Sequence, residues 1–395
     1  MKDIQYKETM MGVFDSPIKV DIGSQSINEL FSQKMQDTRL SKTKIAELLH
    51  MDVGTLTKII DGNYSGASVF NVLKVAMFLG ISMDDFLRAN ADIISLEDVK
   101  EICDIRDTSI LCEYFDIKTL KELGFFGSND YASRIKQFFG FKRLQDYVSN
   151  LARFSAAYSR TKNTYNVKMR NFWTSSASAQ FEKIANPNPY NRSRLMEIMP
   201  NIRPCTKNVE NGLMNVIRAL YAIGVTIIYQ PSIPKMQVRG ATMECNGKPC
   251  IVISDLNKRY PTLWFSLFHE LYHVLFDFDD IRQNKYHVSS SDGDLLLTDE
   301  NSADSFARDF ILSPTKVRFI KTYINAPTIV ERYAKEWGIH PSLIYAIAAY
   351  DDGKWSSYAK YIPKSDKATN VINTNVFQCE SIERSVANFK QKIEL

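Results

Sequence analysis

One heptapeptide decides how this chain of 395 residues is interpreted: Phe268-His269-Glu270-Leu271-Tyr272-His273-Val274. On an α-helix, residues four positions apart lie on one face about one turn apart, so His269 and His273 can offer two imidazole nitrogens to one metal ion. Zinc is the ion that this pattern favours. A zinc site lowers the pKa of a water to about 7, and Glu270 stands where a carboxylate can take that proton. The motif therefore predicts a zinc site with a catalytic glutamate.

The alternative is a histidine pair that only contributes hydrogen bonds to a core. The chain has only 5 histidines, so a chance match to this motif is improbable. The surrounding residues are apolar over most of the helix circumference, which is expected of a buried active-site helix. These residues are Trp264, Phe265, Leu267, Phe268, Leu271, Val274, Leu275 and Phe276.

A catalytic zinc site needs a third protein ligand, and the next acidic pair is Asp299-Glu300. A His-Glu-x-x-His helix followed by Glu-x-x-Ala-Asp-x-Phe-Ala over residues 300–307, and then by Pro314, resembles the ImmA/IrrE family of zinc metallopeptidases. The resemblance implies that Glu300 is the third ligand and that Asp304 accepts a hydrogen bond from a ligand histidine. Asp299 is the competing ligand. Glu300 could also be a helix-start carboxylate that only faces the helix dipole.

The resemblance extends upstream of the metal motif. Residues 216–223 predict a helix, and the β-branched runs at 225–229 and 249–254 predict short strands, with a Gly-Ala segment at 238–241 between them. The chain departs from the family at Ser302, where a second Glu is common, and at Ser313 before the proline. No oxyanion-stabilising residue can be assigned, since Tyr272, Tyr286 and His287 each have a structural alternative.

A second motif lies near the N-terminus. Residues 40–49 predict a short helix capped by Ser41, and residues 53–60 predict a second helix after a tight turn. With the apolar residues on both sides, this pair is similar to XRE-type helix-turn-helix domains over about residues 24–90. The resemblance implies DNA contacts from Lys42, Thr55, Thr57 and Lys58. Because Val53 and Gly54 occupy positions where base-reading side chains are common, dimerisation or protein docking is the alternative.

Composition favours a multidomain, soluble, cytoplasmic protein. The hydrophobic content of 45% is ample for packed cores, and neither a signal peptide nor a membrane span is visible. The 6 cysteines lack Cys-x-x-Cys spacing, which predicts reduced thiols. Residues 118–170 combine basic and aromatic side chains, which predicts amphipathic helices with a solvated basic face or, alternatively, an extended nucleic-acid footprint.

The expected fold is mainly α with an α+β part. We expect an N-terminal extension (1–23), a five-helix helix-turn-helix domain (24–95), a helical basic and aromatic middle region (96–204), a zincin-like α+β peptidase domain with a small sheet (205–352) and a polar C-terminal tail (353–395). The turn-rich segment 185–191, with the prolines that follow it, sets the boundary before the peptidase domain.

The functional expectation is a DNA-binding regulator with zinc endopeptidase activity. Its substrate would be a repressor-type or partner protein, cleaved to control genes of mobile elements, stress or defence, and the expected partners are operator DNA, that substrate and a second copy of the chain, with no membrane. The alternative is a transcription factor or antitoxin-like module whose metal domain senses or docks without turnover. A further hypothesis is that the thiol of Cys245 or Cys250 occupies the open zinc position in a latent state.

Overall fold

The structure is a computed structural model that describes residues 26–64, 66–81, 96–154, 167–233, 236, 238–284, 286–290 and 300–394. The expected extension over residues 1–23 and the competing ligand Asp299 lie outside these ranges. The chain divides into two compact units, 1–108 and 109–395, and each is described here by itself. The fold is mostly helical with one small sheet, as the sequence predicts.

The first unit contains the predicted pair of short helices. Helices α2 (Ile27–Thr38), α3 (Lys42–Leu48), α4 (Val53–Ile60) and α5 (Val69–Leu79) pack around a core that includes Ile45, Leu56 and Ile59. Ser41 caps α3 as predicted, and the Asp52 carboxylate caps α4 by accepting a hydrogen bond from the backbone N–H of Thr55 at 2.8 Å. The helix α7 (Leu96–Tyr114) contains the division between the units.

The second unit begins with helices that bury aromatic rings. Phe138, Phe139 and Tyr147 are buried. The ring of Phe172 contacts the rings of Phe115, Phe138 and Phe139. Residues 118–154 are thus amphipathic helices with core aromatics, one of the two predicted alternatives. The helices are α8 (Ile117–Glu122), α9 (Tyr131–Phe139), α10 (Gln145–Phe154), α11 (Val167–Ile184) and α12 (Arg192–Ile202).

A mixed four-stranded sheet packs against the helix that carries the metal motif. Its strands are β1 (Thr226–Tyr229), β2 (Val238–Cys245), β3 (Lys248–Ile253) and β4 (Tyr286–Ser290), in the order β1-β3-β2-β4. The turn Asn246-Gly247 joins β2 to β3, and both residues have positive φ, as a tight hairpin turn requires. β1 pairs with β3 in parallel, whereas β2 is antiparallel to β3 and β4. The strand β4 was not predicted.

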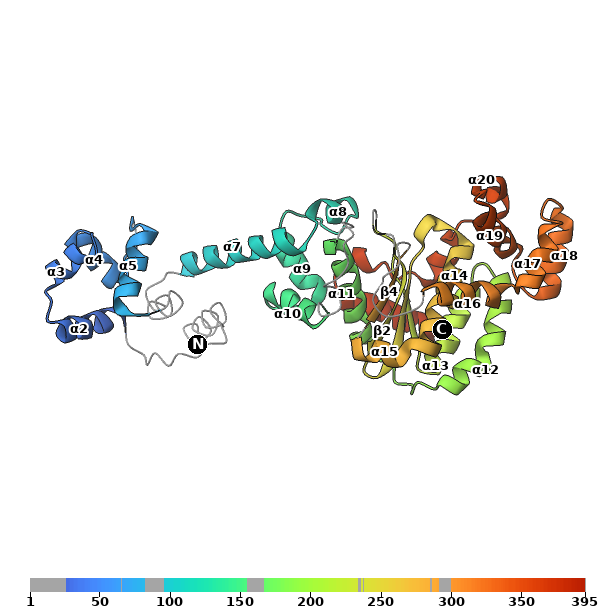
Figure 1. Ribbon diagram of the computed structural model, residues 1–395, viewed down its shortest axis with the longest axis horizontal. Helices are drawn as coiled ribbons and strands as arrows, with labels where there is room; N and C mark the ends of the chain where they lie inside the picture. The colour runs from blue at the N-terminus through green and yellow to red at the C-terminus, as the bar shows by residue number, and fades with distance from the viewer. Residues whose placement is uncertain are drawn as a thin grey trace. The chain divides into compact units, whose positions relative to one another are not determined.

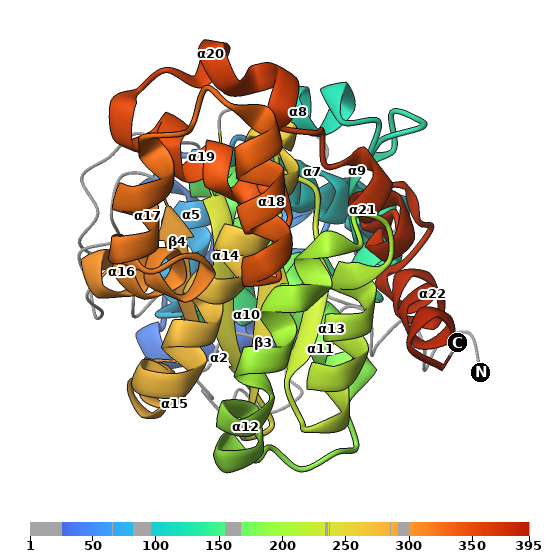
Figure 2. The ribbon, with the colours of Figure 1, turned by 90° about the vertical axis from the view of Figure 1, so that its right-hand side faces the viewer.

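Helices cover the sheet on both faces. Figure 1 shows α11 on one side and α14 (Tyr260–Tyr272) on the other, and both helices contact β2. The helix α14 continues through a π-helical segment (His273–Asp277) into α15 (Phe278–Asn284). Figure 2 shows the helices around α14. The helix α13 (Gly212–Ala222) precedes α14 in the chain, and the helices α16 (Glu300–Ile311), α17 (Pro314–Lys321), α18 (Pro327–Trp337) and α19 (Pro341–Asp352) follow it.

The structure does not divide the chain into separate compact units at the predicted boundaries 204 and 352. One hydrophobic core extends from Ile110 to Phe389, so the middle region and the C-terminal residues belong to the same compact unit as the metal motif. The turn-rich segment at 185–191 is not a linker, because the Asn186 side chain donates hydrogen bonds to the Tyr221 carbonyl at 3.0 Å and to the Thr226 hydroxyl at 3.2 Å. These bonds hold the segment against the edge of the sheet.

The predicted C-terminal tail is also folded. It contains α20 (Trp355–Tyr358), a short turn (Ala359–Tyr361), α21 (Asp366–Ile372), a second turn (Val376–Gln378) and α22 (Ile382–Glu394). The helix α22 buries Ile382, Val386 and Phe389 and packs on α11. These three residues are spaced four and three positions apart, as on one face of a helix. The mean composition of the segment is polar, and the prediction of a tail followed that mean and missed the amphipathic pattern. Among the described residues, no helix combines the length and apolar character needed to cross a bilayer.

Candidate metal centre

The two motif histidines lie side by side on a buried helix. The apolar residues of α14 pack against the sheet and α16, and this packing leaves His269 and His273 with exposed fractions of 2% and 0%. Their Nε2 atoms are 3.2 Å apart. Two unprotonated ring nitrogens at this separation repel each other, and a shared cation would remove the repulsion.

Glu300 brings a carboxylate to the same point. It is the first residue of α16, which packs on α14 along its length. Its Oε2 atom is 3.2 Å from His269 Nε2, and its Oε1 atom is 3.8 Å from His273 Nε2. Donor atoms of the three residues lie within 4.8 Å of one another. The structure therefore contains a triad of side chains that could hold a metal ion.

Two aspartates orient the histidine rings. Asp304 Oδ1 is 2.8 Å from His269 Nδ1, and Asp277 Oδ2 is 2.7 Å from His273 Nδ1. When each Nδ1–H donates to its carboxylate, each Nε2 presents a lone pair to the centre. The structure places Asp304 where the resemblance implies it. Asp277 was missed, although its position four residues after His273 was a usable signal.

The electrostatics of the centre favour positive charge. Burial of the ring lowers the pKa of His269, but the hydrogen bonds to Asp304 and Glu300 and the negative charge of Glu270 outweigh it and raise the pKa from 6.5 to about 9. Without a metal, the centre thus attracts a proton. A divalent cation satisfies the same carboxylates with a larger charge.

Glu270 lies on the sheet side of α14. The Thr242 hydroxyl donates to its Oε2 atom at 2.7 Å, while its Oε1 atom is buried without a hydrogen-bond partner among the described residues. The backbone of Gly240 passes close by, and a Cβ atom at that position would lie 2.5 Å from Oε1. A buried carboxylate oxygen without a donor costs free energy, and a bound water would supply the donor. The carboxylate is therefore held by Thr242 at one oxygen, and its second oxygen lacks a donor among the described residues.

The two cysteines do not reach the centre. Paired residues of antiparallel strands share a face, and Cys250 pairs with Met243, one residue from the Thr242 that contacts α14. Cys250 and Cys245 therefore lie on the opposite face of the sheet. The hypothesis that either thiol closes the metal position is wrong, because the alternation of side chains along β2 and β3 directs both away.

The oxyanion candidates receive no support. The Tyr272 ring packs against Phe276 and Phe306, with centroid distances of 4.8 and 5.6 Å, as a structural residue would. Tyr286 and His287 belong to β4, whose side chains are outside the described part of the structure.

The predicted DNA-contact residues belong to the first unit. Lys58 is exposed and Lys42 is partly exposed at the start of α3. The hydroxyls of Thr55 and Thr57 already donate protons within α4, to Asp52 Oδ2 at 2.5 Å and to the Val53 carbonyl at 2.7 Å. The two threonine hydroxyls are therefore already engaged within the protein, whereas Lys42 and Lys58 offer positive charges to a ligand.

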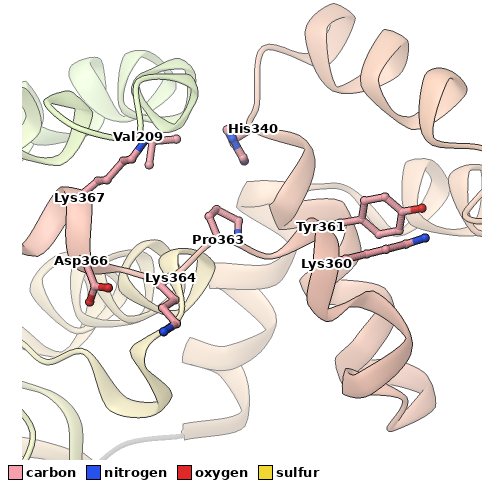
Figure 3. A pocket seen from close by; sticks show the side chains of 8 residues that line it. All are labelled: Val209, His340, Lys360, Tyr361, Pro363, Lys364, Asp366 and Lys367. Carbon is pink, nitrogen blue, oxygen red and sulfur yellow. The ribbon is translucent and has the colours of Figure 1, made fainter.

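Cavities of the second unit lie in two regions. One cavity, of about 610 Å³, reaches the centre at Asp304, the hydrogen-bond partner of His269, although no triad residue lines it. The other region holds a cavity of about 530 Å³ and, sharing Val209 and Lys367 with it, one of about 460 Å³ between the start of α19 and the segment before α21. Figure 3 shows that the lysines of the 460 Å³ cavity do not converge, since Lys360 extends beside Tyr361 and away from Lys367. The first cavity is therefore the one connected with the candidate centre.

Comparison of the chain with protein-family models, with curated proteins and with solved structures gave no match in any of the three. The case for a function consequently depends on the residues of the centre and on the sequence motifs that resemble known families.

Proposed function

We propose that this protein is a zinc-dependent endopeptidase joined in one chain to a DNA-binding helix-turn-helix unit. The observation that carries the proposal is the convergence of His269, His273 and Glu300 next to a buried carboxylate, Glu270, whose Oε1 atom has no hydrogen-bond partner among the described residues. The resemblance of both motifs to the ImmA/IrrE and XRE families supports a regulatory protease whose substrate is a repressor-type protein.

The donor set suits zinc. Two imidazoles and one carboxylate, with a fourth position open, are the ligands of many catalytic zinc sites. In a tetrahedron with zinc–ligand distances of about 2.0 to 2.1 Å, the ligand atoms are separated by about 3.3 Å. The two Nε2 atoms are 3.2 Å apart, and they lie 3.2 Å from Glu300 Oε2 and 3.8 Å from Glu300 Oε1, respectively for His269 and His273, which is the range that one shared ion requires. His269, His273 and Glu300 would hold the ion with little rearrangement.

Each side chain has a role in peptide hydrolysis. When bound, zinc would polarise the scissile carbonyl and make a water acidic enough to be deprotonated. Glu270 would accept the proton of the attacking water and deliver it to the leaving amine. Thr242 fixes the orientation of the Glu270 carboxylate, since it donates to Oε2 and leaves Oε1 as the oxygen that would accept the proton. Asp277 and Asp304 hold the ligand rings in the required tautomer.

Metal removal tests the proposal. Protein loaded with one equivalent of zinc is expected to cleave unfolded polypeptides or a repressor-type protein, to lose this activity after dialysis against a chelator, and to regain it when zinc is restored. Mass spectrometry of the products measures the cleavage. If zinc-loaded protein binds a partner but leaves it intact, a sensing or docking function replaces the proteolytic one.

For the first unit we propose operator binding. Lys58 is exposed on α4, the helix that would enter the major groove in the resemblance, and Lys42 lies at the start of α3. Lys42→Ala and Lys58→Ala are each expected to weaken binding to the promoter DNA of the chain's own gene and to reduce the slope of log K against log salt by about 1. Fluorescence anisotropy over a salt series measures both effects. A Lys34→Ala variant on α2 is the control, and salt-independent binding of the wild-type protein would favour protein docking.

A further inference from the structure

The cavity of about 610 Å³ lies among α14, α16, α19 and α20, the turn at residues 256–259 and the strand β2. Its α14 residues include Thr262 and Phe265, which precede His269 by seven and four residues and so lie on the same helix face. Asp304 of α16 and Arg239 of β2 also line it. The cavity therefore runs along the helix face that carries His269 and reaches the centre at Asp304, the hydrogen-bond partner of His269.

Arg239 reaches this cavity through an irregularity in β2. The pairing of β2 with β4 shifts register between Val238 and Gly240, so Arg239 lies at a β-bulge. Neighbouring residues of a regular strand point to opposite faces, but a bulge permits both Arg239 and Gly240 to face α14. The result is observed in the contacts, since Gly240 abuts Glu270 and Arg239 Nη1 is 3.5 Å from Asp304 Oδ1.

The hydrogen bonding of Arg239 is incomplete. Its Nε atom is buried and has no partner among the described residues. Asp304, its only carboxylate neighbour in the described structure, is also bonded to His269 at the shorter distance of 2.8 Å. A guanidinium can donate several hydrogen bonds in one plane, and this one retains donors for a further acceptor.

The other charges of the cavity are arranged differently. Arg308 is paired with Asp351, which also pairs with Lys321. Arg259 stacks on the Trp355 ring at 4.1 Å and forms no ion pair with any described residue. The cavity thus has one guanidinium group, Arg259, without an ion pair among the described residues, and a second, Arg239, that shares its only described carboxylate partner with His269. Beside them lies an apolar wall of Ile311, Leu343, Ala346 and Ile347.

We propose that this cavity binds substrate residues next to the scissile bond and that Arg239 selects an acidic side chain there, with an apolar neighbour on the wall from α19. This inference rests on the proposed peptidase function and adds a substrate class to it: peptides with Asp or Glu beside a leucine-like residue near the cleavage site. A carboxylate in the cavity completes the donors of Arg239 and lies within the field of Arg259.

Matched peptides test the preference in the wild-type protein. A library of proteome-derived peptides first identifies a cleaved sequence, and peptide pairs then carry Glu or its neutral isostere Gln at each position flanking the bond. At one position, kcat/KM for Glu is expected to exceed that for Gln by about 10- to 100-fold, the range of a hydrogen bond to a charged group. Equal values at every position would overturn the proposal.

Substitution identifies the residue responsible. Arg239→Met is expected to bring the Glu-to-Gln ratio of kcat/KM close to 1, and Arg259→Met is expected to reduce it less. Arg318→Met, at an exposed position of α17 outside the cavity, is the control and should keep the wild-type ratio. A wild-type ratio in a folded, zinc-loaded Arg239→Met variant contradicts the assignment. Zinc content is measured for each variant, since Arg239 contacts Asp304.

Binding separates this inference from the proposed function. Fluorescently labelled octapeptides of Leu and Ala with one central Glu or Gln are titrated into zinc-loaded Glu270→Gln protein and followed by anisotropy. Tighter binding of the Glu peptide, lost in the additional Arg239→Met variant, supports the subsite even if the wild-type protein cleaves no peptide. Cleavage without any preference for Glu in either assay leaves the peptidase proposal intact and removes the subsite.

Discussion

Glu270→Gln is expected to abolish peptide cleavage while the protein retains its fold and its metal. The amide has the shape of the carboxylate and can still accept the hydrogen bond that Thr242 donates at 2.7 Å. It cannot accept a proton from water, and loss of a general base typically costs about 10² to 10⁴ in rate. Steady-state cleavage of a quenched fluorescent peptide, with metal analysis of the same sample, measures both expectations.

A conservative change elsewhere provides the control. Glu331→Gln removes an exposed carboxylate from α18, outside the centre, and should retain wild-type kinetics. If Glu270→Gln cleaves as fast as the wild type, another group is the base or the activity belongs to a contaminant. Repetition with His273→Ala separates these explanations, because a contaminating protease is indifferent to the loss of a metal ligand, whereas an alternative base in this protein would still need the metal.

The parts of the centre that depend on local spacing could be predicted from the sequence. His269 and His273 share a helix face because they are four residues apart, and the apolar residues that flank them predict that this helix is buried, as the structure shows. Glu300 and Asp304 are one turn apart on α16, but only a resemblance to a known motif indicated that α16 packs on α14. Packing between distant segments has no comparable signature in one sequence.

The remaining parts depend on such packing. The spacing of Asp277 four residues after His273 was available in the sequence, but two more aspartates follow within three residues, and the hydrogen bond forms across a widened, π-helical turn. The short, weakly apolar segment Tyr286–Ser290 becomes a strand because β2 offers it an edge. Arg239 lies in the cavity because of a bulge, which spacing along the chain does not encode.

The second large effect concerns the metal itself. The wild-type protein is expected to bind one zinc per chain, and His273→Ala or Glu300→Ala should retain little of it, because two remaining ligands cannot enclose the ion. Elemental analysis and competition with a chromophoric chelator measure stoichiometry and affinity. His50→Ala, an exposed histidine of the first unit, is the control for nonspecific binding. Full zinc retention by both triad variants would refute the ligand assignment.

The two aspartates allow a finer version of this test. Asp277→Asn and Asp304→Asn keep the ligands but weaken the acceptors of the Nδ1 protons, and such changes typically reduce metal affinity by about 10- to 100-fold. Asp304 also receives a contact from Arg239, whereas Asp277 has the shorter bond to its histidine, at 2.7 Å. Zinc affinity should therefore fall in both variants by less than in His273→Ala, and Arg239→Met should shift the affinity only through Asp304. A buried histidine pair without a metal role would show no such order, because none of these substitutions would then alter zinc binding.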